Sequence, residues 1–146
     1  MLADALKTIL ASTMVFSAKA RGFHWNVEGA NFPQYHEFFG DLYTEVYDST
    51  DKCAELVRQL DSYAPGSMSR FLELSIIGEQ TKIPRAELMI AELYDDNEKI
   101  VALLKESFTV AEEENEQGIA DFIAGRIDAH GKWKWQLRSI LKRDRA

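Results

Sequence analysis

The sequence contains one cysteine, Cys53, which excludes an intrachain disulfide framework and a cysteine-rich zinc site. With only three prolines and eight glycines in 146 residues, a collagenous or low-complexity chain is also excluded. No apolar run approaches the roughly 20 residues that a helix needs to cross a bilayer. The opening residues, MLADALKTIL, have the pattern of an amphipathic helix rather than of a signal peptide. We therefore expect a soluble, cytoplasmic protein that has no membrane partner.

The chain has fewer basic than acidic residues, with 17 lysines and arginines and 24 aspartates and glutamates. The formal net charge of −7 makes the chain a poor default binder of nucleic acid, since affinity for phosphate comes largely from lysine and arginine. An acidic surface attracts cations instead. The length suits one domain with a substantial core, so we expect residues 1–146 to form a single domain.

Long segments with helical periodicity dominate the sequence. Apolar residues recur at helical spacing over residues 2–27, over residues 33–63, in a third segment that opens at Thr81 to Pro84, and in a fourth that opens near Gln117. No segment alternates at period two for long enough to indicate a sheet. The apolar stripe of the third segment is expected to comprise Leu88, Ala91, Val101, Leu104 and Phe108.

The connection between the second and third segments, residues 64–83, is too long for a tight antiparallel turn. It also contains an apolar piece of its own, residues 71–77. A helix of 30 residues is about 45 Å long, and a 20-residue connection is long enough to span that length. The second and third helices can therefore run parallel. We therefore predict an all-α, ferritin-like four-helix bundle with a short extra helix in the crossover between the second and third helices.

Possible metal ligands are few. The chain has three histidines, His24, His36 and His130, and it places Asp51 and Glu55 one turn apart on the second predicted helix. Two imidazoles and two carboxylates are a suitable ligand set for iron. Alternatively, because acids four residues apart occur on most helices, these carboxylates form an ordinary solvated face.

The spacing along the second predicted helix constrains such a site. His36 and Asp51 are 15 residues apart, hence about 22 Å apart, and cannot bind the same ion within one chain. They can share an ion if two chains pair antiparallel about a two-fold axis. The Glu-x-x-His signature of common di-iron bundles is absent, which argues against an ordinary intrachain di-iron centre.

These residues resemble the signature of the Dps mini-ferritins (DNA-binding proteins from starved cells). The resemblance rests on the run Phe23-His24-Trp25-Asn26-Val27-Glu28-Gly29, followed by Phe32, His36, Asp51 and Ala54-Glu55. Intervals of 12 residues between the histidines, 15 to the aspartate and four more to the glutamate fit that family. The crossover with a short helix and Trp135, near the C-terminal end, also fit the family pattern, so the resemblance covers nearly the whole chain.

The resemblance implies a hollow homododecamer with a ferroxidase centre, a di-iron site, at each dimer interface. His24 and His36 would come from one chain, and Asp51 and Glu55 from the other. Such an enzyme oxidises ferrous iron, in the family preferentially with hydrogen peroxide, and stores the ferric product as a mineral, which protects the cell from oxidative damage. The rival expectations are a shell whose main role is DNA compaction and a catalytically silent helical cage.

Two positions near these ligands depart from the family pattern. Leu56 follows Glu55 where family members often have arginine, so a structural ion pair is either missing or supplied by Arg58. Arg21 stands where a lysine often precedes the first motif histidine. The resemblance suggests that Arg21 pairs with Asp51 of the other chain and keeps it ionised.

Several other conspicuous residues are expected to be structural. Trp25 is expected to pack at the dimer interface, with absorption of stray oxidising equivalents as the alternative. Cys53 is expected in the core, and His130, on the apolar stripe of the fourth segment, is expected to be a hydrogen-bonded structural residue. Trp133 and Trp135 are expected to contribute packing.

The resemblance also assigns a role to the acidic stretch that contains Glu116 and Asp121. In the family this region lines a pore at a three-fold axis, and Asp121 best matches the pore acid. Three copies of each acid would focus a negative potential and draw in ferrous ions. The alternative is a solvated loop and helix start.

DNA binding, the other activity of the family, usually rests on a flexible lysine-rich tail. The first predicted helix starts within a few residues of Met1, so we expect no such tail at the N-terminus. Against the acidic remainder of the chain, the basic C-terminus is not expected to bind DNA appreciably. Its charged residues are Lys132, Lys134, Arg138, Lys142, Arg143 and Arg145, opposed by Asp144.

Overall fold

The computed structural model describes residues 1–142, and within them all regular structure is helical. The helices are α1 (Leu2–Asn26), α2 (Phe32–Gln59), α3 (Met68–Leu74), α4 (Ala86–Glu113) and α5 (Gln117–Leu141). This confirms the predicted all-α, ferritin-like bundle of four long helices with a short helix in the crossover.

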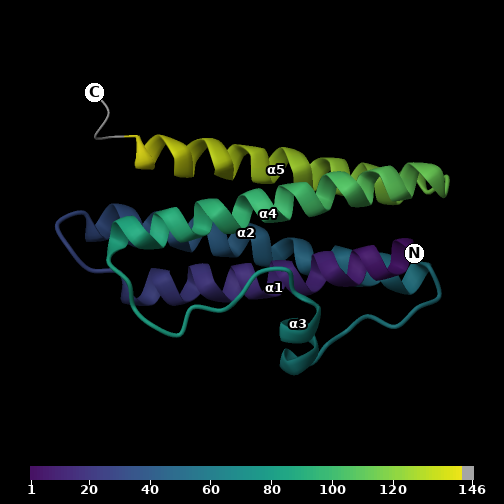
Figure 1. Cartoon of the computed structure of the whole chain (residues 1–146), viewed down its shortest axis with the longest axis horizontal. Helices are drawn as coiled ribbons and strands as arrows, with labels where there is room; N and C mark the ends of the chain where they lie inside the picture. The colour runs from purple at the N-terminus through teal and green to yellow at the C-terminus, as the bar shows by residue number, and fades with distance from the viewer. Residues whose placement is uncertain (143–146) are drawn as a thin grey trace.

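The four long helices form two antiparallel pairs, α1 with α2 and α4 with α5 (Figure 1). The connection after α2 passes through α3 and returns along the bundle, so that α4 runs parallel to α2 (Figure 1). Ser12, which is fully buried in α1, accepts a hydrogen bond of 3.0 Å from the amide of Ile76. A buried polar contact of this kind anchors the crossover to the bundle.

A short turn joins α1 to α2 and brings the adjoining ends of the two helices together. α1 ends at Asn26, and Val27 is already extended. Gly29 has a φ of +123°, which side chains rarely adopt, and its carbonyl accepts a hydrogen bond from the amide of Phe32. Pro33 lies in the first turn of α2, where its missing N–H costs nothing.

The predicted end of α2 was wrong, because the helix ends at Gln59, four residues earlier. Asp61 has a left-handed backbone with a φ of 59° and so terminates the helix. The amide of Ser62 then turns back to donate to the carbonyl of Val57. This is the kind of capping that glycine usually provides, and an aspartate in that role gives no clear signal in the sequence.

The predicted start of α4 was also wrong, because the helix begins at Ala86 rather than at Thr81 to Pro84. Arg85 is still extended, with a ψ of 160°, and its carbonyl accepts the first helical hydrogen bonds. The apolar stripe predicted for this helix was also partly wrong, because Leu88, its first member, is 50% exposed. The large apolar side chains that α4 buries most fully are Met89, Ile90, Leu93, Ile100 and Leu104.

The four long helices enclose a continuous apolar core that includes Phe16, Phe39 and Leu42. Cys53 belongs to this core, as predicted, and its thiol donates to the carbonyl of Leu6 at 3.5 Å. Burial raises the pKa of the Cys53 thiol to about 12, so it has no thiolate character at neutral pH. No helix within residues 1–142 is both long enough and apolar enough to span a membrane.

Candidate metal centre

The two histidines of the sequence motif lie side by side where α1 meets α2. His24 is in the last turn of α1, and His36 is near the start of α2. Their imidazole rings are stacked, with centroids 3.9 Å apart and an interplanar angle of 13°. Both side chains are only half-buried, so a small solute can still reach the pair.

Each histidine is also hydrogen-bonded to the backbone of the other. Nδ1 of His24 donates to the carbonyl of His36 at 2.5 Å, and Nδ1 of His36 donates to the carbonyl of His24 at 2.7 Å. Because a carbonyl oxygen only accepts, the proton of each neutral ring lies on Nδ1. Nε2 of each ring then carries the lone pair with which an imidazole binds a metal ion. Each ring therefore has its Nε2 available as a metal ligand.

Aromatic side chains border the histidine pair. Phe32 stacks on His36 with ring centroids 5.1 Å apart, and Tyr43 lies tilted against His24 at 5.5 Å. These rings restrict the rotation of both imidazoles, which favours a fixed ligand geometry.

The carboxylates that the sequence predicted as ligands lie elsewhere on α2. Asp51 and Glu55 are both exposed and one helical turn apart. Because α2 is continuous, the helical rise places Asp51 about 22 Å from His36. Within residues 1–142, no three histidine, cysteine or acidic side chains lie together as a possible metal site. One chain therefore brings the histidines together but holds the two carboxylates apart from them.

Arg21 and Trp25 lie one turn apart near the C-terminal end of α1. The guanidinium carbon of Arg21 is 5.0 Å from the ring centroid of Trp25, a cation–π contact. Trp25 is 64% exposed, so it does not pack inside its own chain. Arg58, the other arginine that the sequence analysis singled out, donates to the carbonyl of Ser62 and lies over the ring of Tyr63.

Asp121 and Glu116 lie beside the α4–α5 turn, at the end of the bundle opposite to the α1–α2 turn (Figure 1). With Glu112, Asn115 and Phe108 they line a surface hollow of about 370 Å³. Three carboxyl groups around one hollow create a negative potential that attracts cations.

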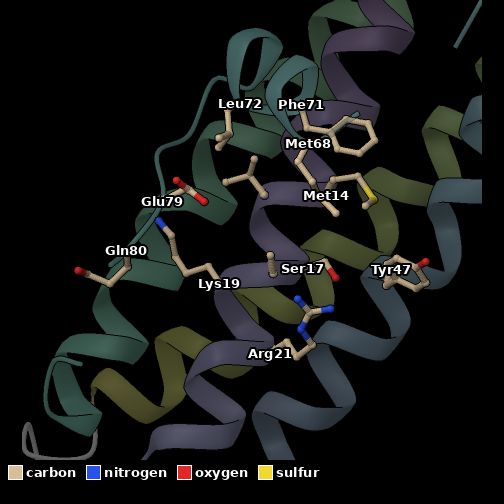
Figure 2. Close-up of a pocket in the computed structure, with 12 residues that line it drawn as sticks. Met14, Ser17, Lys19, Arg21, Tyr47, Met68, Phe71, Leu72, Glu79 and Gln80 are labelled. Atoms are coloured by element: carbon tan, nitrogen blue, oxygen red, sulfur yellow. The ribbon is translucent and has the colours of Figure 1, made fainter. Parts of the chain in front are cut away.

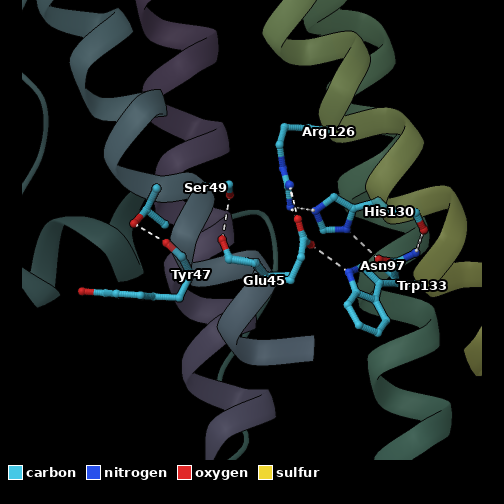
Figure 3. A network of polar contacts seen from close by, with 9 residues as sticks. Glu45, Tyr47, Ser49, Asn97, Arg126, His130 and Trp133 are labelled. Atoms are coloured by element: carbon cyan, nitrogen blue, oxygen red, sulfur yellow. Dashed lines mark hydrogen bonds and ion pairs between the residues drawn. The ribbon is translucent and has the colours of Figure 1, made fainter. Parts of the chain in front are cut away.

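A polar network that the sequence analysis missed joins α2, α4 and α5 (Figure 3). Arg126 donates to both carboxylate oxygens of Glu45, at 2.6 and 3.2 Å, and the indole of Trp133 donates to the same carboxylate at 2.8 Å. Nδ1 of His130 donates to Oδ1 of Asn97 at 2.7 Å, and the Asn97 amide donates back to the His130 carbonyl.

The environment of this network sets the charge of its members. Burial lowers the pKa of His130 to about 3, with a further contribution from the Arg126 guanidinium, so the ring is neutral at physiological pH. Burial alone would raise the pKa of Glu45, but the hydrogen bonds from Arg126 and Trp133 outweigh it, and the pKa is lowered. The prediction that His130 is a hydrogen-bonded structural residue is confirmed.

A second polar cluster that was not predicted joins α1 to α4. Nζ of Lys19, a buried residue, lies 2.6 Å from Oδ2 of Asp96 and 3.9 Å from Oε2 of Glu92. Gln80 of the crossover donates to the other oxygen of Glu92 at 2.9 Å. The cluster therefore links three segments that are distant in sequence.

Lys19 and Gln80 also line a pocket of about 300 Å³ between α1 and the crossover (Figure 2). Exposed apolar side chains gather around the same pocket, because Tyr47, Met68 and Leu72 line it and are 50%, 72% and 47% exposed. A cluster of large exposed apolar residues is typical of a surface that contacts another protein.

The C-terminal region is only partly described, because Arg143, Asp144 and Arg145 lie outside residues 1–142. Within α5, Lys134 forms an ion pair with Glu98 at 3.2 Å. The other cations of the cluster within residues 1–142 are Lys132, Arg138 and Lys142, all of them exposed.

The two late tryptophans differ in their surroundings. Trp133 packs edge-on against Phe38, with ring centroids 5.9 Å apart, as predicted. The prediction that Trp135 contributes packing was wrong for the single chain, because Trp135 is 56% exposed on α5.

Comparisons with known proteins agree with this architecture. A family model described as a ferritin-like domain matches residues 3–146. A low temperature-induced protein of Nostoc sp. (strain PCC 7120) is 33% identical over 141 residues, which cover 95% of this chain and 79% of the relative. DNA protection during starvation protein 2 of Bacillus anthracis is 30% identical over 138 residues, which cover 94% of each chain.

The fold also matches solved structures along nearly its whole length. The crystal structure of the DPS protein from Vibrio cholerae O1 superposes with a TM-score of 0.93 at 28% identity. The match covers 97% of this chain and 89% of that one. That protein is described as a member of a broad superfamily of ferritin-like diiron-carboxylate proteins.

Proposed function

The chain belongs to the Dps group of the ferritin-like family, and on this premise we propose that it oxidises ferrous iron at sites shared between two subunits. The ferric product is stored as a mineral inside a hollow homododecamer, and its removal from solution protects the cell from oxidative damage. Iron is thus both the substrate and the cargo of the assembly.

The observation that carries this proposal is the histidine pair. His24 and His36 lie stacked side by side and each donates from Nδ1 to a carbonyl, which leaves Nε2 of both rings available to bind metal. Two imidazoles are half of a suitable iron site, and the matching carboxylates are too far away in the same chain. A second chain supplies the other half, through Asp51 and Glu55.

A two-fold axis satisfies this requirement with a single interface. When two α2 helices pair antiparallel, the histidine end of each meets the carboxylate end of the other, and two sites form per dimer. The exposed apolar residues Tyr47, Met68 and Leu72 support a second copy on this face of the bundle. Trp25 and Arg21, exposed on α1 beside the histidine pair, then lie near the interface, where Arg21 can pair with Asp51 of the other chain.

The ligand set suits the oxidation of ferrous iron. Imidazole nitrogens bind ferrous iron well, whereas carboxylates favour the harder ferric product. With hydrogen peroxide as oxidant, two ferrous ions each give up one electron, the O–O bond breaks, and two protons complete two water molecules. Because both electrons are delivered at one site, no hydroxyl radical is released.

An anaerobic ferrous titration of the metal-free assembly tests the proposal directly. Ferrous iron is added in steps, peroxide or oxygen follows, and ferric absorbance is recorded. We expect saturable, rapid oxidation at a fixed ratio of iron to subunit, with peroxide faster than oxygen. Oxidation no faster than that of free iron in buffer would contradict the proposal and favour a catalytically silent cage.

Iron is proposed to enter through the acidic hollow of Glu116 and Asp121. Three copies of this hollow around a three-fold axis would concentrate ferrous ions at one opening. Asp121→Asn is therefore expected to slow iron uptake several-fold at low iron concentration and low salt. The difference should shrink as salt screens the charges, because the Debye length falls to about 8 Å near 0.15 M.

Initial uptake rates at several salt concentrations measure this effect. Asp128→Asn is the matched control, because Asp128 is an exposed acid of α5 that does not line the hollow. Equal rates for Asp121→Asn and the wild type at low salt would show that iron enters elsewhere.

DNA compaction is the second candidate function, favoured by exposed cations on α5 beside the exposed Trp135. Six basic residues against one acid give residues 132–146 a charge of +5, which leaves −12 for the rest of a chain whose net charge is −7. DNA that approaches the cluster must also approach this acidic surface. Attraction is therefore expected only at low salt, where fewer counterions compete.

A gel-shift titration of the intact assembly with linear duplex DNA tests this expectation. We expect no retardation at micromolar protein in 150 mM salt and weak retardation at about a tenth of that salt. Submicromolar retardation at 150 mM salt would make DNA compaction the leading function.

A further inference from the structure

We propose that Gly40 is a positioning residue for His24, because the absence of a side chain at position 40 leaves the space that the imidazole occupies. A Cβ added at Gly40 would lie 2.9 Å from Cε1 and 3.0 Å from Nδ1 of the His24 ring. Both distances are shorter than an ordinary van der Waals contact. The inference rests on the proposed function, which makes His24 an iron ligand.

The His24 ring has little room to yield to such a Cβ. It is stacked on His36 at 3.9 Å, it is bordered by Tyr43 at 5.5 Å, and its Nδ1 is bonded to the His36 carbonyl at 2.5 Å. A movement away from Gly40 therefore disturbs the stacking, the hydrogen bond or both. Since this hydrogen bond also fixes the direction of Nε2, the displacement reaches the metal-binding atom.

Gly40 has no other evident reason to be glycine. It lies inside α2, where glycine is less favourable than alanine for the stability of a helix. Its φ is not positive, unlike that of Gly29. At each of the other seven glycines, an added Cβ would meet nothing within 4 Å. A locally unfavourable residue beside a candidate ligand is the pattern expected of a site that requires close approach of a backbone.

The test compares Gly40→Ala with the matched control Gly125→Ala. Gly125 is also inside a helix, α5, but an added Cβ there meets nothing within 4 Å. Cobalt(II), which oxygen does not oxidise readily at such sites, is titrated calorimetrically into the assembled, metal-free protein. We expect Gly40→Ala to weaken cobalt affinity roughly 10-fold to 100-fold, as displacement of a ligand-orienting group does, and Gly125→Ala to leave it unchanged.

A second readout needs no metal. The chain has only three histidines, so carbon-13 labels on the ring Cε1 give three signals, which His24→Gln and His36→Gln variants assign. Because stacked aromatic rings shift one another's resonances, the His24 signal is expected to move in Gly40→Ala while that of the buried His130 stays in place. Gly125→Ala should leave all three signals unchanged.

The two readouts separate the possible failures. An unmoved His24 signal in Gly40→Ala, or wild-type cobalt affinity in that variant, would overturn the inference while leaving the proposed function standing. If His24→Gln binds cobalt as the wild type does, the proposed function fails, and the metal-free signal alone then decides whether Gly40 positions the ring.

Discussion

Alanine at His24 or at Asp51 is expected to abolish rapid ferrous oxidation in assemblies built from either variant alone. Each substitution removes one ligand from every site, because each proposed site uses His24 of one chain and Asp51 of the other. A loss of at least 100-fold in the initial rate is expected, since ligand residues act as a unit and the remaining ones do not retain the ion in the reactive geometry. Stopped-flow ferric absorbance measures the rate, and gel filtration checks that the assembly is intact.

Mixed assemblies of these two variants give the sharper result. In a dimer of one His24→Ala chain and one Asp51→Ala chain, one site lacks both ligands and the other site retains the full set. Random mixing makes half of all dimers mixed, so about a quarter of the sites, and about a quarter of the wild-type rate, should return. A site built within one chain would recover nothing in any mixture.

Two matched mixtures act as controls. His24→Ala mixed with His36→Ala should stay inactive, because both ligands come from the same chain and every site then lacks one of them. Asp51→Ala mixed with Glu55→Ala should stay inactive for the same reason. Recovery in these controls would show that subunits exchange ligands in another way, and full activity in any single-variant assembly would refute the ligand assignment.

The bundle was predictable from sequence because its helices are long and their apolar periodicity is strong. The ends of the helices were less predictable. Asp61 terminates α2 and Arg85 precedes α4 through backbone conformations that many residues can adopt. The apolar pattern of α4 misplaced Leu88, because single apolar residues on a helix surface do not distinguish the core face from an exposed one.

The candidate site was predictable to a similar degree. The closeness of His24 and His36 follows from the short turn between their helices, and the distance to Asp51 follows from helical rise. The meeting of these residues across two chains remains a prediction. The reciprocal hydrogen bonds and the role of Gly40 depend on the distance between α1 and α2, which side-chain packing sets and sequence spacing does not reveal.

The ion pairs between helices, of which Lys19–Asp96 is buried and Glu45–Arg126 is part-buried, were missed for a different reason. Lys19 and Asp96 are 77 residues apart, and Glu45 and Arg126 are 81 apart. Charged residues on a helix are normally assigned to solvent, and periodicity within one helix does not show which charge faces an opposite charge on another. The stability of the bundle should therefore depend strongly on a pair that the sequence did not identify.

Asp96→Ala is expected to destabilise the bundle more than any exposed substitution. Lys19 has a side chain that is only 4% exposed, so loss of Asp96 leaves its charge buried with Glu92 at 3.9 Å as the remaining partner. Removal of one member of a buried pair costs about 3–5 kcal/mol of the free energy of unfolding. For a chain of this size, the melting temperature should fall by on the order of 10 °C. Thermal unfolding must be followed at one protein concentration, because subunit association contributes to the apparent stability.

Two further variants identify the cause of this loss. Lys134→Met removes an exposed ion pair with Glu98, whose side chains are 36% and 40% exposed, and should change the free energy of unfolding by less than about 1 kcal/mol. The double variant Lys19→Met/Asp96→Leu replaces the buried pair with apolar side chains and should recover most of the lost melting temperature, because no buried charge is left without its partner. A double variant as unstable as Asp96→Ala would instead show that the pair matters for the close packing of α1 against α4, and that apolar side chains of similar size cannot reproduce that packing.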